Sequence, residues 1–582
     1  MWNEQPKIRI EKRIEILLWI FLAAFAFLVI RLWYLSILET ALYQQKSEMN
    51  RIRITSLPAP RGNIYDRYGK ILAQDMPHYA VSYLPENLEM SDIVSRLERV
   101  IGRSIDNLPR ERPSGEILLI DSITFEEVIR IEEAKQDLPG IMVEVRPSRV
   151  YPGDDTLSHI IGYIGSIGKE ELREKGHLGY GAEDLIGKSG IELYYEEVLR
   201  GEKGYRRIEV DALGKIVRML DVQPPRFNNS LVLTVDYEFQ KFGHELLQGK
   251  RGVIVAGKPQ TGEILVMATY PAFSPNRLVQ GLTHEEWTRL IEDPRQLFHN
   301  QSLQSLHPPG SIFKPLLALG ALEENLVDGN QRIFCPGYFD YNEFRYHCWR
   351  RSGHGALNLV EAIAVSCNIF FFHLGLKIGP VGINRWAANF LLNSGSGIDL
   401  PGEKISLFPD ARWKRQRFAE RWFPGDTLNY SIGQGYLLMT PFSMYRLIAG
   451  IATRGTLYQP HLLKQIITND GTLERVNTPK VVKKLTLKDS TWHLVQEGMR
   501  QAVRNGTAQM LGDLPVAIAG KTGTAQNPHG EDHSWFGGFF PADNPEIVLL
   551  VFIEHGGDGS GIATRITRSM IEWYLTHRGG RL

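Results

Sequence analysis

The hydrophobic pattern sets a short segment near the N-terminus apart from the rest of the chain. Between Ile16 and Leu38 the only charged residue is Arg31, and nearly all other positions are apolar. As a helix this stretch would extend roughly 35 Å, which is enough to cross the hydrocarbon core of a bilayer. The pattern therefore predicts a transmembrane anchor at residues 16–38, preceded by a short tail at residues 1–15.

The residues around this segment predict its orientation. Basic residues precede it and favour a cytoplasmic N-terminus. They are Lys7, Arg9, Lys12 and Arg13. A cleaved signal peptide and a buried core helix are the alternatives, but the small residues Ala24 and Ala26 lie inside the apolar segment and not after it. We therefore expect a single-pass protein of the cytoplasmic (inner) membrane, whose remaining residues are periplasmic or otherwise extracytoplasmic.

Beyond the anchor the pattern predicts two folded regions. Residues 39–228 combine a juxtamembrane helix, short β-rich runs and polar helices such as Thr124–Lys135, which indicates an elongated pedestal of mixed structure. A Pro- and Asn-containing stretch at Asp221–Ser230 is the predicted linker. We expect residues 229–580 to form a second, larger domain.

This second domain begins and ends with patterns of strand and helix. A strand is predicted at Leu231–Val235 and a helix at Tyr237–Leu247. Further elements are predicted as strands at Gly252–Ala256, Glu263–Ala268 and Glu546–Glu554, and as a closing helix at Ala563–His577. Strands at both ends with helices between them predict an α/β (α+β) domain whose sheet unites the two termini of the region.

Composition narrows the function classes. The chain has 582 residues, and Lys+Arg and Asp+Glu both number 66, so the formal net charge is zero. A nucleic-acid partner is not expected, because the chain has no basic bias. The hydrophobic share of 43% is ordinary for a globular protein, and the sequence contains no internal repeat or low-complexity run.

Three short motifs in the second domain carry the candidate chemistry. Ser311 and Lys314 lie three residues apart, so they share one face of a helix and the lysine amine can accept the serine proton. The other two motifs are Ser366-Cys367-Asn368 and Lys521-Thr522-Gly523. Singly, each motif is weak, because a helix cap or a solvated lysine produces the same residues. In this order they are typical of enzymes that penicillin acylates.

The residues around Ser311 predict its surroundings. Pro309 and Gly310 place Ser311 at the N-terminus of a helix. The partial positive charge of the helix end disfavours a protonated Lys314, and backbone N–H groups there can stabilise an oxyanion. The position therefore suits both a nucleophile and its base.

The second motif is predicted to lie on a helix from Asn358 to Leu374, with Ser366 and Asn368 near its middle. The Ser366 hydroxyl is expected to relay protons to Lys314 or to the leaving group, and the Asn368 amide to hold a substrate carbonyl. The plain alternative is that both are small polar residues on a packed helix.

The third motif follows an apolar stretch and predicts an edge strand. Gly523 lets another backbone approach closely, so an extended peptide can pair with this strand. We expect Lys521, Thr522 and Thr524 to bind a terminal carboxylate, and the Thr524 N–H to complete an oxyanion hole. An ordinary edge strand guarded by a lysine is the alternative.

The cysteines suggest a second site. All three, Cys335, Cys348 and Cys367, fall within 33 residues, with His354 among them. Three thiolates and an imidazole form a closed tetrahedral zinc set, so we expect one structural zinc ion per chain. A Cys335–Cys348 disulfide with one buried thiol, or three inert cysteines, are the alternatives.

Together these segments resemble the class B penicillin-binding proteins, and the resemblance covers nearly the whole chain. The matching segments are Arg61–Arg67, Gly187–Glu192, His307–Ser311, Gly433–Gly435 and Gly520–Gln526. They are most similar to the elongation-type branch, penicillin-binding protein 2. The resemblance implies a catalytic domain with an antiparallel sheet between helical layers.

The resemblance also implies a function. The chain would be a D,D-transpeptidase that cross-links peptidoglycan during cell elongation. Ser311 would attack the penultimate D-alanine carbonyl of a stem peptide, and an amine of a neighbouring stem would resolve the acyl-enzyme. β-Lactams would trap the same serine.

The implied partners are lipid-linked nascent glycan, a SEDS-family glycosyltransferase of the rod-shape type and other elongation-complex proteins. In relatives a zinc site uses Asp, Asp, His and Cys ligands. These positions match Cys335, Cys348, His354 and Cys367 here, so cysteine replaces both aspartates.

Other functions remain as alternatives: a division-type transpeptidase, a D,D-carboxypeptidase or β-lactamase-like acyl hydrolase, and a non-catalytic scaffold that activates a glycosyltransferase. One class of β-lactamase needs an added glutamate base, and Gly425 stands where that glutamate would be. A secreted lactamase also has no use for an anchor and pedestal. The scaffold is disfavoured because all catalytic groups are present.

Overall fold

The computed structural model describes most of the chain. The described residues are 5–40, 51–83, 90–105, 117–182, 184–210, 216–528 and 530–579. Their contacts divide the chain into two compact units. The first unit consists of Met1–Ala59, Pro77–Pro147 and Glu202–Arg226, and the second of Pro60–Met76, Ser148–Gly201 and Phe227–Leu582. The second unit thus joins two segments of the predicted pedestal to the predicted catalytic domain.

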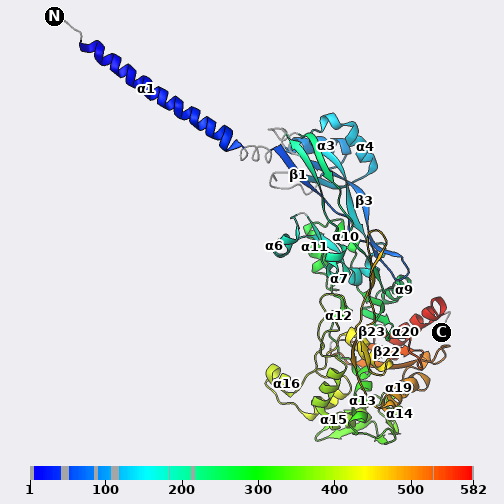
Figure 1. The fold of residues 1–582 in the computed structure, drawn as a ribbon. Coiled ribbons are helices and arrows are strands. Elements are labelled where there is room, and N and C mark those ends of the chain that lie inside the picture. The colour runs from blue at the N-terminus through cyan, green and yellow to red at the C-terminus, as the bar shows by residue number, and fades with distance from the viewer. Residues whose placement is uncertain are drawn as a thin grey trace. The chain divides into compact units, whose positions relative to one another are not determined.

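A long helix is the N-terminal element of the first unit. Helix α1 (Gln5–Trp33) continues as a π-helical turn at Tyr34–Leu38 (Figure 1). The span Lys12–Leu38 is long and apolar enough to cross a membrane, and none of it is buried. This agrees with the predicted anchor. The predicted juxtamembrane helix falls largely on residues 41–50, which lie outside the described residues.

The rest of the first unit is a small α+β fold. Its elements are β1 (Ile52–Leu57), β3 (Ile71–Tyr83, in part), α3 (Met90–Ile101), β4 (Ile117–Ile123), α4 (Phe125–Glu133), β5 (Ile141–Val150, in part), β8 (Gly204–Val210) and β9 (Ile216–Gln223). Strands β1, β8 and β9 form an antiparallel sheet, and Leu97 and Ile131 bury the apolar faces of α3 and α4. Helix α4 agrees with the predicted helix at Thr124–Lys135. Strand β9 extends to Gln223, so residues 221–223 of the linker predicted at Asp221–Ser230 belong to a strand, and the prediction is wrong for them.

A five-stranded antiparallel sheet forms the centre of the second unit (Figure 1). Its order is β12 (Ile264–Tyr270), β11 (Gly252–Gly257), β23 (Ile547–Ile553), β22 (His533–Phe540) and β21 (Ala519–Ala525). Strands from both ends of the region therefore meet, since β11 pairs directly with β23. The two strands predicted at Gly252–Ala256 and Glu263–Ala268 pair as β11 and β12, and the predicted union of the two ends is confirmed.

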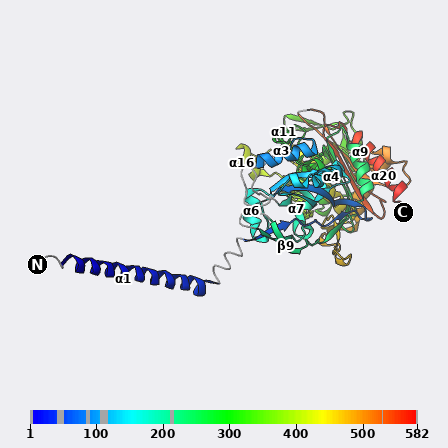
Figure 2. The ribbon, with the colours of Figure 1, turned by 90° about the horizontal axis from the view of Figure 1, so that it is seen from above.

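Helices cover both faces of this sheet because its side chains are apolar on both faces. Ile254 of β11 packs in one cluster with α9 (Tyr237–Leu247) and α20 (Ile562–His577), which lie side by side in Figures 1 and 2. The next residue, Val255, belongs to the other cluster, with α13 (Lys314–Glu323) and α18 (Pro441–Ala452). Alternation along a strand sends neighbouring side chains to opposite faces. The layered arrangement predicted for the domain is thus confirmed.

A strand from the N-terminal part of the chain also belongs to the second unit. Strand β2 (Ile64–Tyr65) runs parallel to β10 (Ser230–Leu233). At Gly62 a β carbon would lie 1.9 Å from the carbonyl oxygen of Asn229, so only glycine permits this approach. The segment that follows Arg61 is therefore packed directly onto the catalytic region.

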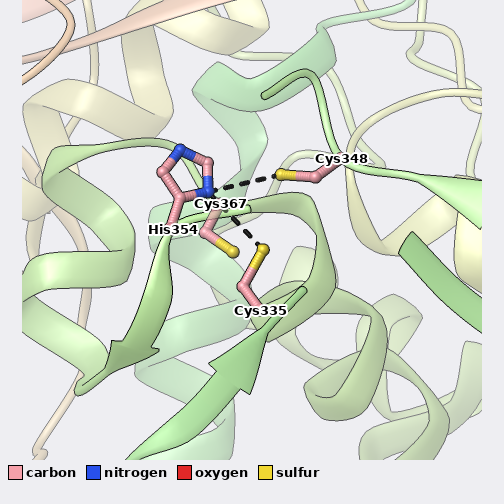
Figure 3. A group of neighbouring side chains, drawn as sticks. All are labelled: Cys335, Cys348, His354 and Cys367. Atoms are coloured by element: carbon pink, nitrogen blue, oxygen red, sulfur yellow. Dashed lines mark hydrogen bonds between the residues drawn. The ribbon is translucent and has the colours of Figure 1, made fainter. Parts of the chain in front are cut away.

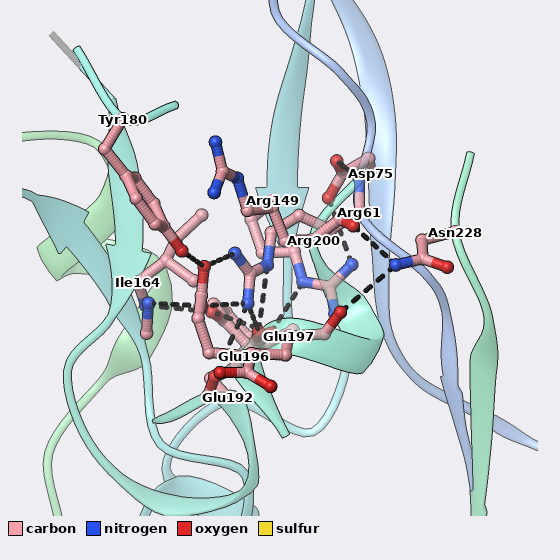
Figure 4. Close-up of polar contacts among 12 residues, drawn as sticks. Arg61, Asp75, Arg149, Ile164, Tyr180, Glu192, Glu196, Glu197, Arg200 and Asn228 are labelled. Atoms are coloured by element: carbon pink, nitrogen blue, oxygen red, sulfur yellow. Dashed lines mark hydrogen bonds and ion pairs between the residues drawn. The ribbon is translucent and has the colours of Figure 1, made fainter. Parts of the chain in front are cut away.

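A buried network of ion pairs holds together the segments of the second unit that surround Arg61 (Figure 4). Arg61 contacts Glu192 at 2.9 Å and Glu196 at 2.7 Å, and Arg149 contacts Glu192 at 2.7 Å and Asp75 at 3.1 Å. All five side chains are at most 7% exposed. Buried charges are tolerated only when they are paired and hydrogen-bonded, so each partner depends on the others.

Replacing Glu192 by glutamine should strongly destabilise the second unit. In Glu192→Gln, Arg61 and Arg149 would keep buried positive charges without their shared carboxylate, and we expect a loss of about 3 kcal/mol in the free energy of unfolding. Thermal unfolding of the full chain in detergent measures this loss. Glu285→Gln is the control, because Glu285 pairs with Arg289 on an exposed helix face and should contribute less than about 1 kcal/mol. Equal effects of the two changes would contradict the prediction.

Candidate active site and metal cluster

Ser311 lies in a short turn that opens a helix. The 3-10 turn Gly310–Phe313 leads directly into α13, which begins at Lys314, as the sequence predicted. Gly310 has a φ of +59°, and a β carbon there would lie 2.5 Å from the carbonyl oxygen of Thr524. Glycine at this position therefore lets the turn pack against β21. Ser311 lines a cleft of about 590 Å³.

The amine of Lys314 is fully buried one turn after Ser311. It donates hydrogen bonds to the carbonyl oxygen of Ser366 and to Oδ1 of Asn368, both at 2.8 Å, and lies 3.3 Å from the Ser366 hydroxyl. Burial lowers the pKa of Lys314 to about 8, although the neighbouring sulfur groups of Cys348 and Cys367 act in the opposite direction. A substantial neutral fraction near neutral pH makes this amine suitable as a base.

The predicted helix at Asn358–Leu374 is wrong, because the chain breaks at the second motif. Helix α14 (Leu359–Ala364) ends before Ser366, whose φ is +56°, and α15 (Asn368–Asn389) begins two residues later. The break frees the Ser366 carbonyl oxygen from helical hydrogen bonding, so it can accept the Lys314 bond. Sequence reasoning missed the break, since neither glycine nor proline marks it.

The third motif lies on β21, the last strand of the sheet. The Thr522 hydroxyl donates to that of Thr507 at 2.7 Å, and the Thr524 hydroxyl donates to Asp558 at 3.3 Å. Thr507, Thr522 and Thr524 all line the cleft. Thr507 was not predicted as a site residue, because it stands in a loop with no motif of its own.

Lys521 and Gly523 share the face of this strand that is turned toward the Ser311 turn and Lys314. The Lys521 amine is buried and donates to the Thr522 carbonyl oxygen at 2.9 Å. Burial and the neighbouring Lys314 lower the pKa of Lys521. A β carbon at Gly523 would lie 3.0 Å from the Pro309 carbonyl oxygen, so glycine allows the strand to pack against the Ser311 turn. Five of the eight predicted catalytic residues thus line one cleft, and the other three, Lys314, Lys521 and Gly523, contact or adjoin them.

The three cysteines and His354 converge beside the break at Ser366 (Figure 3). The four candidate ligand atoms lie within 4.8 Å of one another. Nδ1 of His354 lies 3.6 Å from Cys335 Sγ and 3.5 Å from Cys348 Sγ, and all three cysteines are free of disulfides. Tetrahedral zinc with bonds of about 2.0–2.3 Å would separate neighbouring ligand atoms by roughly 3.5–3.8 Å, so the donor types and their spacing fit zinc.

The cluster is linked to the catalytic residues. Cys348 Sγ accepts a hydrogen bond from the backbone N–H of Asn368 at 3.4 Å. Hydrogen bonds from the Cys367 thiol and from His354 lower the pKa of Cys348, which favours the thiolate that metal binding needs. Any movement of the cluster would therefore be transmitted to Asn368.

Comparisons with known proteins agree with this arrangement. Residues 252–572 match the penicillin binding protein transpeptidase domain, and residues 56–233 match the penicillin-binding protein dimerisation domain. The peptidoglycan D,D-transpeptidase MrdA of Acinetobacter baumannii is 33% identical and aligns with 94% of this chain and 84% of its own length.

Solved structures are similar over most of the chain. One is a complex between penicillin-binding protein PBP2 and MreC from Helicobacter pylori, with a TM-score of 0.78, 27% identity, and coverage of 90% of this chain and 99% of that one. Another, from a study of how a peptidoglycan synthase complex coordinates polymerization and crosslinking, has a TM-score of 0.74, 31% identity, and coverage of 98% and 99%.

The rate at which a penicillin acylates Ser311 should depend on pH through Lys314. Only the neutral amine accepts the serine proton, and its share grows as pH rises through about 8. We expect the second-order rate constant for fluorescent penicillin labelling to increase about tenfold between pH 7 and pH 9. A flat profile across this range, with the protein folded at both ends, would show that Lys314 is not the base.

Proposed function

The chain belongs to the class B penicillin-binding proteins, and on that premise we propose that it is a peptidoglycan D,D-transpeptidase acting through an acyl-enzyme at Ser311. One observation carries the assignment of roles. The buried Lys314 amine, held by Ser366 and Asn368, lies one turn after a serine that lines the same cleft as Thr522 and Thr524 of β21.

Acylation requires one proton to move as one bond forms. The Ser311 oxygen attacks the carbonyl of the penultimate D-alanine while neutral Lys314 takes the hydroxyl proton. Backbone N–H groups of Ser311 and Thr524 stabilise the oxyanion. As the peptide bond breaks, the proton passes through the Ser366 hydroxyl to the nitrogen of the leaving D-alanine.

Deacylation repeats these steps in reverse with a different nucleophile. The amine of a neighbouring stem peptide attacks the Ser311 ester and gives up a proton to Lys314. The ester bond breaks, the serine oxygen recovers a proton, and a new peptide cross-link is released. β-Lactams present the same kind of acyl group and stay attached to Ser311.

Hydroxyl groups on β21 suit the terminal carboxylate of the acyl donor. Thr522 and Thr524 face the cleft, and Thr507 extends this row of hydroxyls. The buried Lys521 supports the strand through the Thr522 carbonyl oxygen. Asn368 holds the substrate amide on the other side of Ser311.

Crowding at Gly425 favours a transpeptidase over a β-lactamase-like hydrolase. A β carbon at Gly425 would lie 2.3 Å from the Tyr346 hydroxyl, so a glutamate there would require the Tyr346 side chain to move. With glycine at position 425, the glutamate base that one class of β-lactamase uses is missing at that position, so rapid hydrolysis by that route is not supported. The acyl-enzyme can then wait for an amine acceptor.

We further propose that Cys335, Cys348, His354 and Cys367 hold one structural zinc ion. The donor types and their spacing support this. A bound zinc would add folding free energy and would serve no step of the reaction. The four side chains position the break that carries Ser366 and Asn368.

The anchor and the relatives suggest where the protein works and with what. We propose a single-pass protein of the cytoplasmic membrane, with its N-terminus inside and its catalytic unit outside, that acts on nascent glycan during elongation. The similar structures from a complex with MreC and from a peptidoglycan synthase complex support contacts with the elongation machinery. A SEDS-family glycosyltransferase is the proposed polymerising partner.

Removing the Ser311 hydroxyl should abolish cross-linking. Ser311→Ala deletes the nucleophile, and the residual rate should be at least about a thousandfold lower. Cross-linked dimers of stem peptides formed on nascent glycan measure this rate by liquid chromatography. Ser394→Ala is the control, because Ser394 is exposed and lies outside the cleft. Normal cross-linking by Ser311→Ala would instead support the scaffold function.

The purified protein should contain about one zinc ion per chain. Cys348→Ser should lower the zinc content and slow penicillin acylation on the order of tenfold to a hundredfold, because Asn368 loses its support. Elemental analysis and labelling kinetics measure the two effects. Wild-type protein with far less than one zinc ion and a Cys335–Cys348 disulfide by mass spectrometry would rule the site out.

A further inference from the structure

One part of the cleft lining is a segment that includes Cys348, one of the four proposed zinc ligands. Arg345–Trp349 and Arg351 line the cleft from this side, and we call residues 345–351 the loop wall. Its backbone is held at Cys348, whose N–H donates to the Gly337 carbonyl oxygen at 2.9 Å. The Trp349 indole N–H donates to the Val365 carbonyl oxygen at 3.0 Å. These bonds fix the position of the wall relative to Ser366.

The loop wall contributes two arginines to the cleft lining, Arg345 and Arg351, and only the first is paired with a carboxylate. Arg345 forms two hydrogen bonds with the Asp340 carboxylate, at 2.6 and 2.9 Å, so its charge is already balanced. Arg351 is exposed, and within the described part of the chain its side chain has no hydrogen bond or ion pair. Arg351 therefore offers an unpaired guanidinium to a ligand in the cleft.

The position of Asn368 indicates which part of a substrate reaches the loop wall. Asn368 Nδ2 donates to the His347 carbonyl oxygen at 3.5 Å, and its backbone N–H donates to Cys348 Sγ. In the proposed function Asn368 holds an amide of the acyl donor. The next residues of the donor, toward its N-terminus, would then meet the loop wall. The terminal carboxylate lies elsewhere, with Thr522 and Thr524.

We propose that Arg351 is a specificity-determining residue that binds a carboxylate carried by the acyl donor on the N-terminal side of its D-Ala-D-Ala end. The Trp349 side chain, 57% exposed, provides a flat apolar surface for the aliphatic part of the same residue. A guanidinium suits a carboxylate because it donates two parallel hydrogen bonds. This inference rests on the proposed function and names the substrate feature that the site selects.

Competition with fluorescent penicillin tests the inference on the full-length protein in detergent. Two synthetic D-Ala-D-Ala peptides are compared, which differ only in whether the preceding residue carries a side-chain carboxylate or its carboxamide. For each protein, the ratio of the two inhibition constants is measured. We expect wild-type protein to prefer the carboxylate peptide about tenfold. Using a ratio within one protein removes effects of partial unfolding.

Variants of adjacent arginines give a matched comparison. Arg351→Ala should reduce the ratio to near one, and Arg351→Lys should restore part of it. Arg350→Ala should keep the wild-type ratio, because Arg350 does not line the cleft. The inference is overturned if wild-type protein shows no preference, if Arg351→Ala keeps it, or if Arg350→Ala loses it equally. Failure of penicillin to label wild-type Ser311 would instead contradict the proposed function.

Discussion

The burial of the Lys314 amine is the constraint that shapes the rest of the site. An amine removed from water needs polar partners, and the protein supplies the Ser366 carbonyl oxygen and the Asn368 side chain. A continuous helix at this point would have used that carbonyl oxygen for its own hydrogen bond. The left-handed conformation at Ser366 is therefore the local cost of holding a base close to the nucleophile.

Close contact between backbones positions the nucleophile as firmly as side chains do. A β carbon at Gly433 would lie 2.1 Å from the Gly310 carbonyl oxygen, and one at Gly559 would lie 2.2 Å from the Gly523 carbonyl oxygen. The Ser311 turn is thus held between β21 and the loop at Gly433. Backbone N–H groups in such a rigid turn need little rearrangement to meet a developing oxyanion. The geometry of the cleft follows from these contacts.

Local patterns predicted the parts of the fold that bury continuous apolar segments. The strands and helices at both ends of the catalytic region were predicted because their residues are apolar over several consecutive positions, as in β11 and β23. The pairing of strands that are far apart in the sequence produces no such local pattern of apolar residues. The pairing of β2 with β10 depends on residues far apart in sequence, and only the folded chain shows that Arg61 shares a compact unit with the catalytic region.

The same distinction applies to the site. The three motifs identified the catalytic residues because each carries reactive side chains within a few positions. The break at Ser366 and the contact of Thr507 with Thr522 were missed, since both depend on distant backbone and side-chain packing. The spacing of the cysteines suggested their convergence, and the folded chain places their sulfur atoms beside the catalytic break.

The nucleophile is identified most directly by finding the residue that penicillin modifies. Full-length protein would be labelled with a fluorescent penicillin and digested, and the modified peptide sequenced by mass spectrometry. We predict a single stable adduct on Ser311. An adduct on another side chain, such as Ser366, or rapid release of the label without a stable adduct, would contradict it.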